Sequence, residues 1–367
     1  MNIAYIITGL GLGGAEVITI DIANRTARNG NNALILYLTG ENALEHRIDA
    51  QVETVGLDLR KTPLHYLKAL LKARRILRKF RPDIVHAQMF YACMFARILR
   101  LIFYRPKLIC TEHANNLEAE YRMRMYRFTD FISDFNTNVS QQAVDYFIEQ
   151  KAFKRSNSRA VYNGIDLSRF VPNPGVRAPV RRRYGIKDGD FLFLNVGRLN
   201  SLKDQHTLIA AFSTLPEARL MIVGEGELEA DLKQFAAEKK ADGSIIFAGA
   251  HNNVEDFYNA ADCFVLSSAW EGFGIVLAEA MACALPVITT DAGGCREVVD
   301  DDAYVVPPGD SVQLAGKMHL IQTLSPAERQ AAGNKNRIKA ARFDITHTVA
   351  QWTTIYTGLC QGGQCIK

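Results

Sequence analysis

Two glutamates that stand eight residues apart are the first candidates for chemistry in this sequence. Glu271 lies in a glycine-rich turn, and Glu279 lies on the helix that the turn begins, within SSAWEGFGIVLAEAMA. Eight helical residues rise about 12 Å, so the two carboxylates cannot share one proton or one metal ion. They can contact opposite ends of an elongated ligand. A nucleotide sugar fits this spacing, with hexose and ribose hydroxyls on the two carboxylates and the diphosphate facing the N–H groups around Gly272 and Gly274.

A second candidate is the glycine loop GLGLGG at residues 9–14, which matches the GxGxxG pattern between an expected strand and an expected helix. Dinucleotide sites of this kind need an Asp or Glu at the end of the second strand to bind the ribose. Residues 34–40 read LILYLTG and the first carboxylate is Glu41, so NAD binding is disfavoured. Two interpretations stay open: the glycines let backbone N–H groups approach an anion, or they form only a tight turn.

These candidates need a scaffold, and the apolar pattern predicts alternating strands and helices. The first half starts with a strand, the glycine loop and a helix from Ala15 to about Asn29, and its expected strands are residues 3–7, 33–38, 83–87, 107–112 and 131–139. The second half repeats this rhythm, with apolar segments at 191–199, 219–228, 244–250, 262–268, 286–294 and 304–310. The alternation predicts an α/β fold of two Rossmann-like domains, whose parallel sheets face a central cleft and bind ligands at the carboxyl ends of their strands.

The boundary between the two domains is expected near residue 170. Residues 171–179, VPNPGVRAP, contain three prolines and a glycine and are the linker that the composition favours. The predicted domains are therefore residues 1–170 and 171–344. Residues 345–367 are expected to form a helix to about Gly358, able to pack back on the first domain, and a loose tail.

Composition excludes several classes of protein. With 367 residues, 48% hydrophobic and 22% charged, the chain is expected to fold rather than stay disordered. Its seven cysteines lack any CxxC spacing, which indicates neither a disulfide framework nor a zinc site, and predicts a reducing compartment. The pattern shows no signal peptide and no transmembrane helix, so we expect a soluble cytoplasmic protein. A net charge of +4 is too small to indicate a nucleic-acid partner.

The charge is unevenly distributed along the chain. Residues 60–107 hold 13 Lys or Arg and one acid, a net charge of +12, which leaves −8 for the rest. The helical spacing puts four bases on one face, Lys68, Lys72, Arg75 and Lys79, and predicts that the opposite face carries Leu67, Leu70, Leu71 and Leu77. With the apolar segment 90–105 and the basic aromatic segment 121–128, this predicts a surface for anionic lipid headgroups or a lipid diphosphate. The alternative is a solvated helix beside a buried one.

A family resemblance joins these features. Residues 197–297 carry VGRLxxxKD, VGEGEL, SSxxEGFGxxxxEAMA, PVITTDAGG and a following Glu, and they closely resemble retaining GT-B glycosyltransferases of family 4, the group 1 type. The two-domain layout matches over almost the whole chain. The resemblance implies transfer of a sugar, with its α configuration kept, from a nucleoside-diphosphate sugar, UDP favoured, to an acceptor hydroxyl. A lipid-linked glycan of O-antigen, capsule or lipopolysaccharide synthesis is the expected acceptor.

The resemblance also assigns roles in the second domain, which would bind the donor. Glu271 would bind the donor sugar hydroxyls and Glu279 the ribose. Arg198 and Lys203 would neutralise the departing diphosphate. The remaining expected donor contacts are Glu225 and the backbone of Gly272, Phe273 and Gly274. Ala284 departs from the family's usual glycine and leaves the ligand residues intact.

In the first domain, which would bind the acceptor, the resemblance places Gly13 and Gly14 beside the reaction centre. His113 would reach the donor sugar, and with Glu271, Arg198 and Lys203 completes the expected catalytic set. His86 would have a supporting role, and residues 163–166 would form an interdomain turn. A lone histidine after a strand is also common as a purely structural group.

The expected enzyme needs neither a metal nor another cofactor, because Arg198, Lys203 and a helix N-terminus can stabilise the leaving diphosphate. Asp300, Asp301 and Asp302 are better explained as an exposed acidic turn than as a metal site. The expected partners are the nucleotide sugar, a glycan or polyprenyl-diphosphate-linked acceptor, and an anionic membrane, on the cytoplasmic face of the inner membrane. The alternatives are a GT-B epimerase or phosphorylase, or a catalytically silent scaffold of polysaccharide assembly.

Overall fold

The computed structural model describes residues 1–11, 13–40, 42–103, 106–114 and 119–362. Leu12, Glu41, residues 104–105 and Cys365 therefore lie outside the described residues. The chain divides into unit 1, which is Met1–Gly164 with Ile345–Lys367, and unit 2, which is Ile165–Asp344. The first division falls six residues before the position expected from the sequence, and the last helix belongs to unit 1.

Unit 1 is built on a seven-stranded parallel sheet. Its strands are β1 Asn2–Ile7, β2 Asn32–Tyr37, β3 Glu53–Gly56, β4 Ile84–Gln88, β5 Lys107–Glu112, β6 Phe135–Asn138 and β7 Ser158–Ala160. Their order is β3-β2-β1-β4-β5-β6-β7, and the register of β1 and β4 runs from Ile3 beside Ile84 to Ile7 beside Gln88. Since the order reverses between β1 and β4, the loops that follow these strands diverge and leave space at the carboxyl edge.

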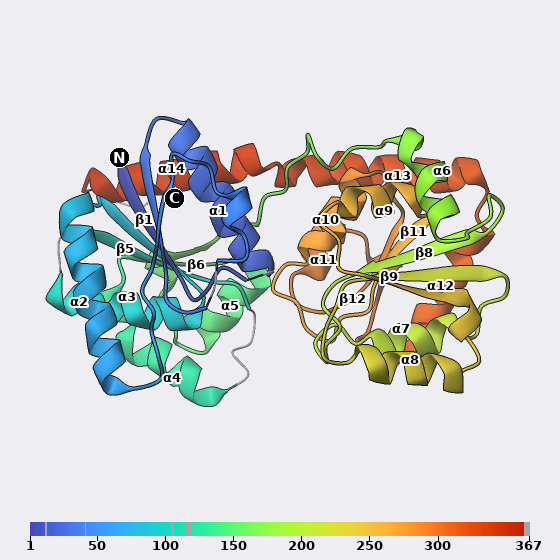
Figure 1. The fold of residues 1–367 in the computed structure, drawn as a ribbon, viewed down its shortest axis with the longest axis horizontal. Coiled ribbons are helices and arrows are strands. Elements are labelled where there is room, and N and C mark those ends of the chain that lie inside the picture. The colour runs from blue at the N-terminus through green and yellow to red at the C-terminus, as the bar shows by residue number, and fades with distance from the viewer. Residues whose placement is uncertain (12, 41, 104–105, 115–118, 363–367) are drawn as a thin grey trace. The chain divides into compact units, whose positions relative to one another are not determined.

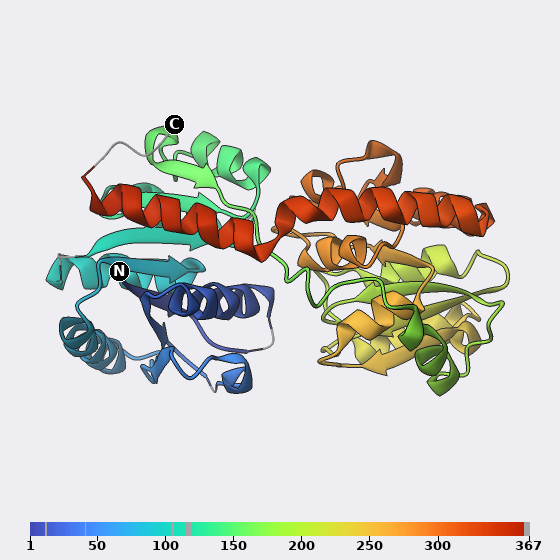
Figure 2. The same ribbon diagram turned by 90° about the horizontal axis from the view of Figure 1, so that it is seen from above.

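Helices cover both faces of this sheet (Figure 1). They are α1 Gly14–Arg28, α2 Pro63–Phe80, α3 Phe90–Ile102, α4 Glu120–Thr129, α5 Gln141–Glu149 and α14 Ile345–Cys360, with 3-10 turns at Glu45–Arg47, Asp130–Ile132 and Arg155–Asn157. The red helix α14 lies beside α1 in both views (Figures 1 and 2). On the other face, α3 packs against β1, β4 and β5. Strand side chains alternate between these two layers.

Unit 2 is built on a six-stranded parallel sheet. Its strands are β8 Phe191–Val196, β9 Ala218–Val223, β10 Ile245–Gly249, β11 Cys263–Leu266, β12 Val287–Thr290 and β13 Val305–Val306, in the order β10-β9-β8-β11-β12-β13. Here the order reverses between β8 and β11. The two sheets confirm the prediction of two Rossmann-like α/β domains.

In unit 2, α6 precedes the first strand, and helices follow each of the six strands, two of them after β13. They are α6 Pro174–Arg183, α7 Gln205–Phe212, α8 Glu229–Glu238, α9 Val254–Ala260, α10 Ile275–Ala282, α11 Cys295–Val299, α12 Ser311–Thr323 and α13 Pro326–Ala340, with 3-10 turns at Asp242–Ser244, Asp302–Tyr304 and Ala341–Phe343. Within the described residues, no helix combines the length and the apolar character that a membrane crossing requires.

The linker prediction for residues 171–179 was wrong, because most of this segment belongs to α6. Pro174 occupies the start of the helix, where a backbone N–H would have no helical partner, so a proline there costs little. The side chain of Asn173 caps the same end by accepting the N–H of Gly175 at 3.1 Å. The prolines therefore mark a helix start.

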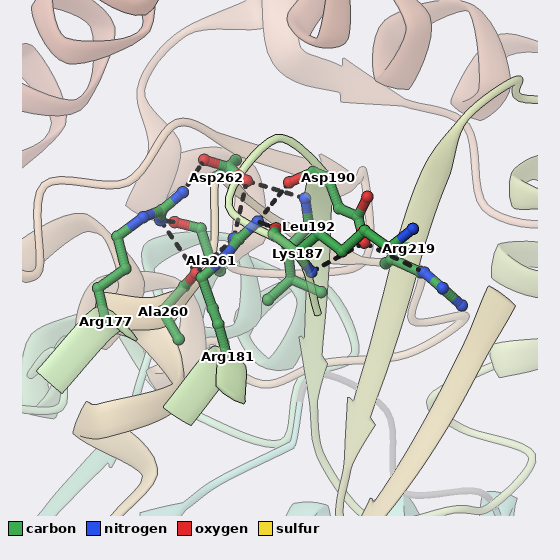
Figure 3. A network of polar contacts seen from close by, with 9 residues as sticks. All are labelled: Arg177, Arg181, Lys187, Asp190, Leu192, Arg219, Ala260, Ala261 and Asp262. Carbon is green, nitrogen blue, oxygen red and sulfur yellow. Dashed lines mark hydrogen bonds and ion pairs between the residues drawn. The ribbon is translucent and has the colours of Figure 1, made fainter. Parts of the chain in front are cut away.

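An ion-pair network fixes α6 within unit 2 (Figure 3). Arg177 and Arg181 reach Asp262, with N to O distances of 2.6 and 3.3 Å, and Asp262 also accepts the N–H of Leu192 at 2.8 Å. The guanidinium of Arg181 further donates to the carbonyl of Lys187 at 2.9 Å and to that of Asp190. Arg181 is 1% exposed, so its charge depends on these partners for the solvation it has lost.

One face of α2 was predicted incorrectly. Leu67 and Leu71 were expected on the side opposite the four bases, but they are 52% and 51% exposed, as Leu64 is at 59%, and so share the solvent side with the bases. The buried residues of this helix are Ala69, Leu70, Ala73 and Leu77. Two alanines one turn apart let the helix approach its neighbours closely, which turns the alanine side inward and leaves leucines in solvent.

We expect Asp262→Ala to lower the free energy of unfolding of the full chain by about 3 kcal/mol, because it strands the buried Arg181 guanidinium without its carboxylate. Urea titration followed by circular dichroism measures this loss. Asp242→Ala removes an exposed carboxylate from the same unit and should change the free energy by less than about 0.5 kcal/mol. Equal effects of the two substitutions would contradict the role given to Asp262.

Candidate functional site

The donor-side candidates gather at the carboxyl edge of the unit 2 sheet, where its strand order reverses. One loop, residues 197–204, follows β8, and a second, residues 267–274, follows β11. The N–H groups of Ala269 and Trp270 both donate to the carbonyl of Leu202, at 2.9 and 3.2 Å. The two loops are therefore joined by backbone hydrogen bonds, although Leu202 and Ala269 are 67 positions apart in the sequence.

Glycines hold the loop after β8 in place. A Cβ atom on Gly224 would lie 2.0 Å from the carbonyl oxygen of Gly197, and one on Gly226 would lie 2.3 Å from that of Leu199. Gly224 also has a φ of +143°, which disfavours other residues. The glycines of VGEGEL are thus required by close backbone packing beneath Arg198. The sequence motif alone did not reveal this reason.

Arg198 lies on the surface beside the carboxylate of Glu227. Its Nε and Nη2 atoms donate to Glu227 Oε2 at 3.2 and 3.1 Å, and both side chains are more than half exposed. An exposed pair of this kind contributes little to stability. Its carbonyl accepts from the buried Gln205 side chain at 3.1 Å, so the backbone is fixed while the guanidinium can move to another anion.

Lys203 and Glu271 are brought into direct contact. The Lys203 ammonium contacts Glu271 Oε1, and the hydroxyl of Ser268 donates to the same oxygen at 2.8 Å. The Lys203 side chain is 22% exposed and that of Glu271 11%, so the pair is largely screened from water. Asp204 caps α7 directly after Lys203 by accepting the N–H of Thr207 at 3.2 Å. The positively charged Lys203 ammonium and the hydrogen-bond-accepting Glu271 carboxylate therefore lie side by side in a partly buried position.

The glycine-rich turn leads from Glu271 into α10. Gly274 has a φ of +81° and precedes the helix, a backbone conformation that glycine adopts without strain. The Phe273 side chain is 2% exposed and packs edge-on against Phe343, with 5.1 Å between ring centroids. Only the backbone of Phe273 can therefore present groups to a ligand. The backbone N–H groups at this helix start suit an anion.

Glu279 lies on α10, about one turn after the start of the helix and eight residues after Glu271, on the helix that the turn was expected to begin. The hydroxyl of Tyr258, from α9, donates to Glu279 Oε2 at 2.8 Å. Tyr258 is fully buried, and its burial together with the Glu279 charge raises its pKa well above the usual range. The tyrosine therefore stays protonated and orients the carboxylate. Sequence reasoning missed Tyr258, whose only signal is an apolar position on a short helix.

Glu225, the remaining predicted donor contact, lies at the carboxyl end of β9. Its Oε1 accepts the N–H of Ala250, just after β10, at 3.4 Å, and its side chain is exposed. Its role in donor binding stays a prediction.

In unit 1, the two predicted histidines lie on neighbouring strands, His86 in the middle of β4 and His113 just after the end of β5. His86 is fully buried within β4, and burial lowers its pKa to about 3. His113 follows β5, and burial lowers its pKa to about 4. Both rings are therefore neutral at pH 7. They are not in direct contact, because Gln88 lies between them, 2.7 Å from His113 Nε2 and 3.0 Å from His86 Nε2.

The glycine loop does not present an open anion site at Gly13. A Cβ atom on Gly13 would lie 2.3 Å from a carboxylate oxygen of Glu16, in the first turn of α1. The helix N-terminus is thus complemented by the chain's own acid, and burial raises the pKa of that acid. Gly14 begins α1 and is exposed. Because glycine has no side chain, a ligand can approach its backbone closely.

Two further polar residues at this edge were missed by the sequence reasoning. Gln88 ends β4, and Glu112 ends β5 directly before His113. Glu112 accepts the N–H of His113 at 3.0 Å and the hydroxyl of Tyr126 at 2.9 Å, while burial raises its pKa to about 7. Their signal in the sequence was their position at strand ends, where parallel sheets collect ligand groups.

The three acids at residues 300–302 each form an ion pair. Asp302 pairs with Arg296, Asp300 with Arg342 at 3.3 Å, and Asp301 with Lys339 at 3.8 Å. In the part of the chain that the structure describes, no three His, Cys, Asp or Glu residues are grouped so as to hold a metal ion.

Family models match both halves of the chain. "Glycosyl transferases group 1" matches residues 176–339, and "Glycosyltransferase Family 4" matches residues 12–169. A putative glycosyltransferase of Bacillus subtilis, EpsD, is 25% identical over 323 residues, which are 83% of this chain and 84% of that protein. An Escherichia coli UDP-Gal:alpha-D-GlcNAc-diphosphoundecaprenol alpha-1,3-galactosyltransferase is 25% identical over 260 residues, which are 66% of this chain and 67% of that protein.

A solved structure shares the fold. The crystal structure of Anabaena Alr3699/HepE in complex with UDP and glucose superposes with a TM-score of 0.85 at 23% identity, covering 96% of this chain and 98% of that one. A sucrose-phosphate synthase from Thermosynechococcus elongatus has a TM-score of 0.86 at 21% identity, covering 99% of this chain and all of that one.

We expect Tyr258→Phe to raise the Kd for UDP about tenfold, because Glu279 loses the hydroxyl that orients it, and a hydrogen bond to a charged group contributes about 1.5 kcal/mol. Isothermal titration calorimetry with UDP and 2′-deoxy-UDP measures the effect, which should be smaller for the deoxynucleotide. Tyr304→Phe removes a half-buried hydroxyl of the same unit and should leave both Kd values unchanged. A uniform loss for both nucleotides would contradict the predicted contact between Glu279 and the ribose.

Proposed function

The chain belongs to the group 1 glycosyltransferases of family 4 and has their GT-B fold, and from this premise we propose a retaining transfer of a sugar from UDP to a lipid-linked acceptor. The glycosyltransferase activity itself, with a nucleotide-sugar donor, follows from the family. The stereochemistry, the base and the acceptor are the proposal.

The contact between Lys203 and Glu271 carries the proposal. It places a cation suited to a diphosphate against a carboxylate suited to sugar hydroxyls, at the reversal point of a parallel sheet. The bond between sugar and diphosphate is the bond that such a pair would straddle. Glu279 lies eight residues later, on α10, where it suits the ribose.

The proposed reaction needs no covalent intermediate on the protein. The bond between the anomeric carbon and the diphosphate oxygen breaks, and the acceptor oxygen bonds to the anomeric carbon on the same face. The acceptor proton passes to the leaving diphosphate. Arg198 and Lys203 stabilise the charge that develops on this diphosphate, and Glu271 and the neutral His113 hold the sugar, so the protein acts by electrostatics and by positioning.

Two features support the choice of substrates. The Escherichia coli relative is named for a UDP-sugar donor and a diphosphoundecaprenol-linked acceptor. The basic helix α2 belongs to unit 1, the half that matches the family 4 model and that would bind the acceptor. A lipid diphosphate acceptor would present negative charge to such a surface.

We also propose that the enzyme works without a metal ion or other cofactor. The two cations Arg198 and Lys203 and the start of α10 supply positive charge where a metal would otherwise be needed.

We expect Lys203→Ala to lower turnover of UDP-sugar at least about a hundredfold, the usual effect of removing one transition-state donor. It should also abolish most of the thermal stabilisation that the donor gives the wild type. Thermal-shift measurements with UDP-, GDP- and ADP-sugars identify the donor, and product NMR then shows the anomeric configuration, with and without chelator.

The matched control is Lys233→Ala, which removes an exposed lysine of α8 paired with Glu229. It should leave turnover unchanged. Near-wild-type turnover of Lys203→Ala would contradict the role of Lys203, inversion at the anomeric carbon would contradict the proposed mechanism, and loss of turnover in chelator would contradict metal independence. Conversion of the donor without acceptor would indicate an epimerase instead.

We further propose that α2 binds an anionic membrane on the cytoplasmic face of the inner membrane. Its outer face combines the bases Lys68, Arg75 and Lys79 with the exposed leucines Leu64, Leu67 and Leu71. The fourth predicted base, Lys72, is engaged with Asp58 at 3.0 Å and with the Gly56 carbonyl at 2.7 Å. Exposed leucines among basic residues are typical of helices that lie in a membrane interface.

We expect the wild type to sediment with vesicles that contain phosphatidylglycerol at low salt, and a variant with Lys68, Lys72, Arg75 and Lys79 changed to Glu to stay in solution, since each base contributes about 1 kcal/mol. Changing Leu64, Leu67 and Leu71 to Ser should release the protein at lower salt than the wild type. Lys233→Glu with Lys239→Glu, on α8, is the charge control. Equal binding of all variants would contradict the proposal.

A further inference from the structure

A chain of polar side chains links His113 to the C-terminal helix α14. Gln88 contacts His113 through its Oε1 at 2.7 Å and His86 through its Nε2 at 3.0 Å. The other ring nitrogen of His86, Nδ1, lies 2.7 Å from the hydroxyl of Tyr356. Gln88, His86 and Tyr356 are each no more than 1% exposed. Water therefore does not compete for these hydrogen bonds, and each group depends on its protein partner.

The alternation of side chains in β4 creates this arrangement. Val85 and Ala87 belong to the apolar core on the α3 face, so His86 and Gln88 point to the opposite face, which α14 covers. There the Trp352 ring lies 4.3 Å from the His86 ring, centroid to centroid, and Trp352 also stacks on Tyr356. The histidine is thus enclosed between strand neighbours and two aromatic side chains of α14.

The polarity of the Gln88 amide assigns the protons. Its Oε1 can only accept, so His113 Nε2 carries a hydrogen. Its Nε2 can only donate, so His86 Nε2 is unprotonated, and the hydroxyl of Thr111, 2.6 Å from that nitrogen, donates to it as well. The single proton of neutral His86 is then on Nδ1 and is donated to Tyr356. The lone pair of His113 is consequently on Nδ1.

The backbone beside Gln88 is held as firmly as its side chain. Met89 has a φ of +73°, a conformation that residues other than glycine rarely adopt, and its N–H donates to the carbonyl of Thr111 at 2.9 Å. Such a conformation persists only where the surroundings enforce it. The end of β4 therefore has little freedom to reposition Gln88.

We infer that Gln88 is a positioning residue, which holds His113 with its proton on Nε2 and its Nδ1 ready to accept a hydroxyl hydrogen of the donor sugar, and that α14 secures Gln88 through Tyr356 and His86. The contact with the sugar rests on the proposed function, whereas the protonation of His113 is a property of the free protein. Residues at the C-terminal end of the chain thus act on the reaction centre without touching substrate.

Long-range ¹⁵N NMR of the histidine rings in the full chain tests the first half of this inference. The wild type at pH 7.5 should show His113 protonated on Nε2 and His86 on Nδ1. Gln88→Met keeps the side-chain length but lacks the acceptor, so His113 should become a mixture of both tautomers. Gln88→Glu keeps an acceptor for His113 but cannot donate to His86, so only His86 should change its tautomer.

Steady-state kinetics tests the second half of the inference, which is that Gln88 and α14 act on the reaction through His113. Gln88→Met should lower kcat about tenfold with little change in the KM for the donor, and Gln88→Glu should recover most of this loss. Tyr356→Phe should lower kcat about threefold. Its matched control is Thr348→Val, which removes another hydroxyl of α14, the one that donates to the Tyr162 carbonyl at 3.2 Å, and should leave kcat and the His113 signals unchanged.

An unchanged His113 tautomer in Gln88→Met would overturn the inference, as would equal effects of Tyr356→Phe and Thr348→Val. If the tautomer changes as expected while His113→Ala keeps full turnover, the positioning by Gln88 is supported and the proposed sugar contact of His113 fails. The NMR readout therefore separates the two.

Discussion

The reversal of strand order within each parallel sheet is the constraint on which the candidate sites depend. At β1 and β4 in unit 1, and at β8 and β11 in unit 2, neighbouring strands send their loops to opposite faces. Polar groups can collect at such a point without interrupting the sheet, because the strands end there. Lys203 and Glu271 meet at one reversal point, and Gln88 lies at the end of β4 beside the other.

The side chains that we propose to bind the nucleotide sugar each contact another part of the protein, and these contacts differ in strength. Arg198 pairs with an exposed glutamate, so another anion can displace that contact at little cost. Lys203 and Glu271 form a more buried pair, and Glu279 is oriented by a fully buried tyrosine. This gradient suits a site that keeps the carboxylate of Glu279, which we propose to bind the ribose, fixed while the outer cation Arg198 adjusts to the ligand.

The faces of α2 show that a pattern of charged residues does not determine which side of a helix packs against the core. The basic residues of α2 were identified from spacing, but the leucines assigned to the side opposite them include two that are about half exposed. The error arose because a helix with leucines around most of its circumference has no unique apolar face. Small residues, Ala69 and Ala73, settled which side packs inward.

The order and spacing of residues were enough to identify most strands, though not the short edge strands β3 and β7, and the two parallel sheets, the helix that carries Glu279 and the family. These features depend on local periodicity and on motifs within one segment. Order and spacing were not enough to find Tyr258, Gln88 or the packing role of Gly224, since each acts on a residue from another element. Nor did the prolines at 171–179 reveal a helix, as its arginines are held by Asp262, more than 80 residues away. Such partners become neighbours only when the sheets form, because long-range contacts depend on topology rather than on local sequence.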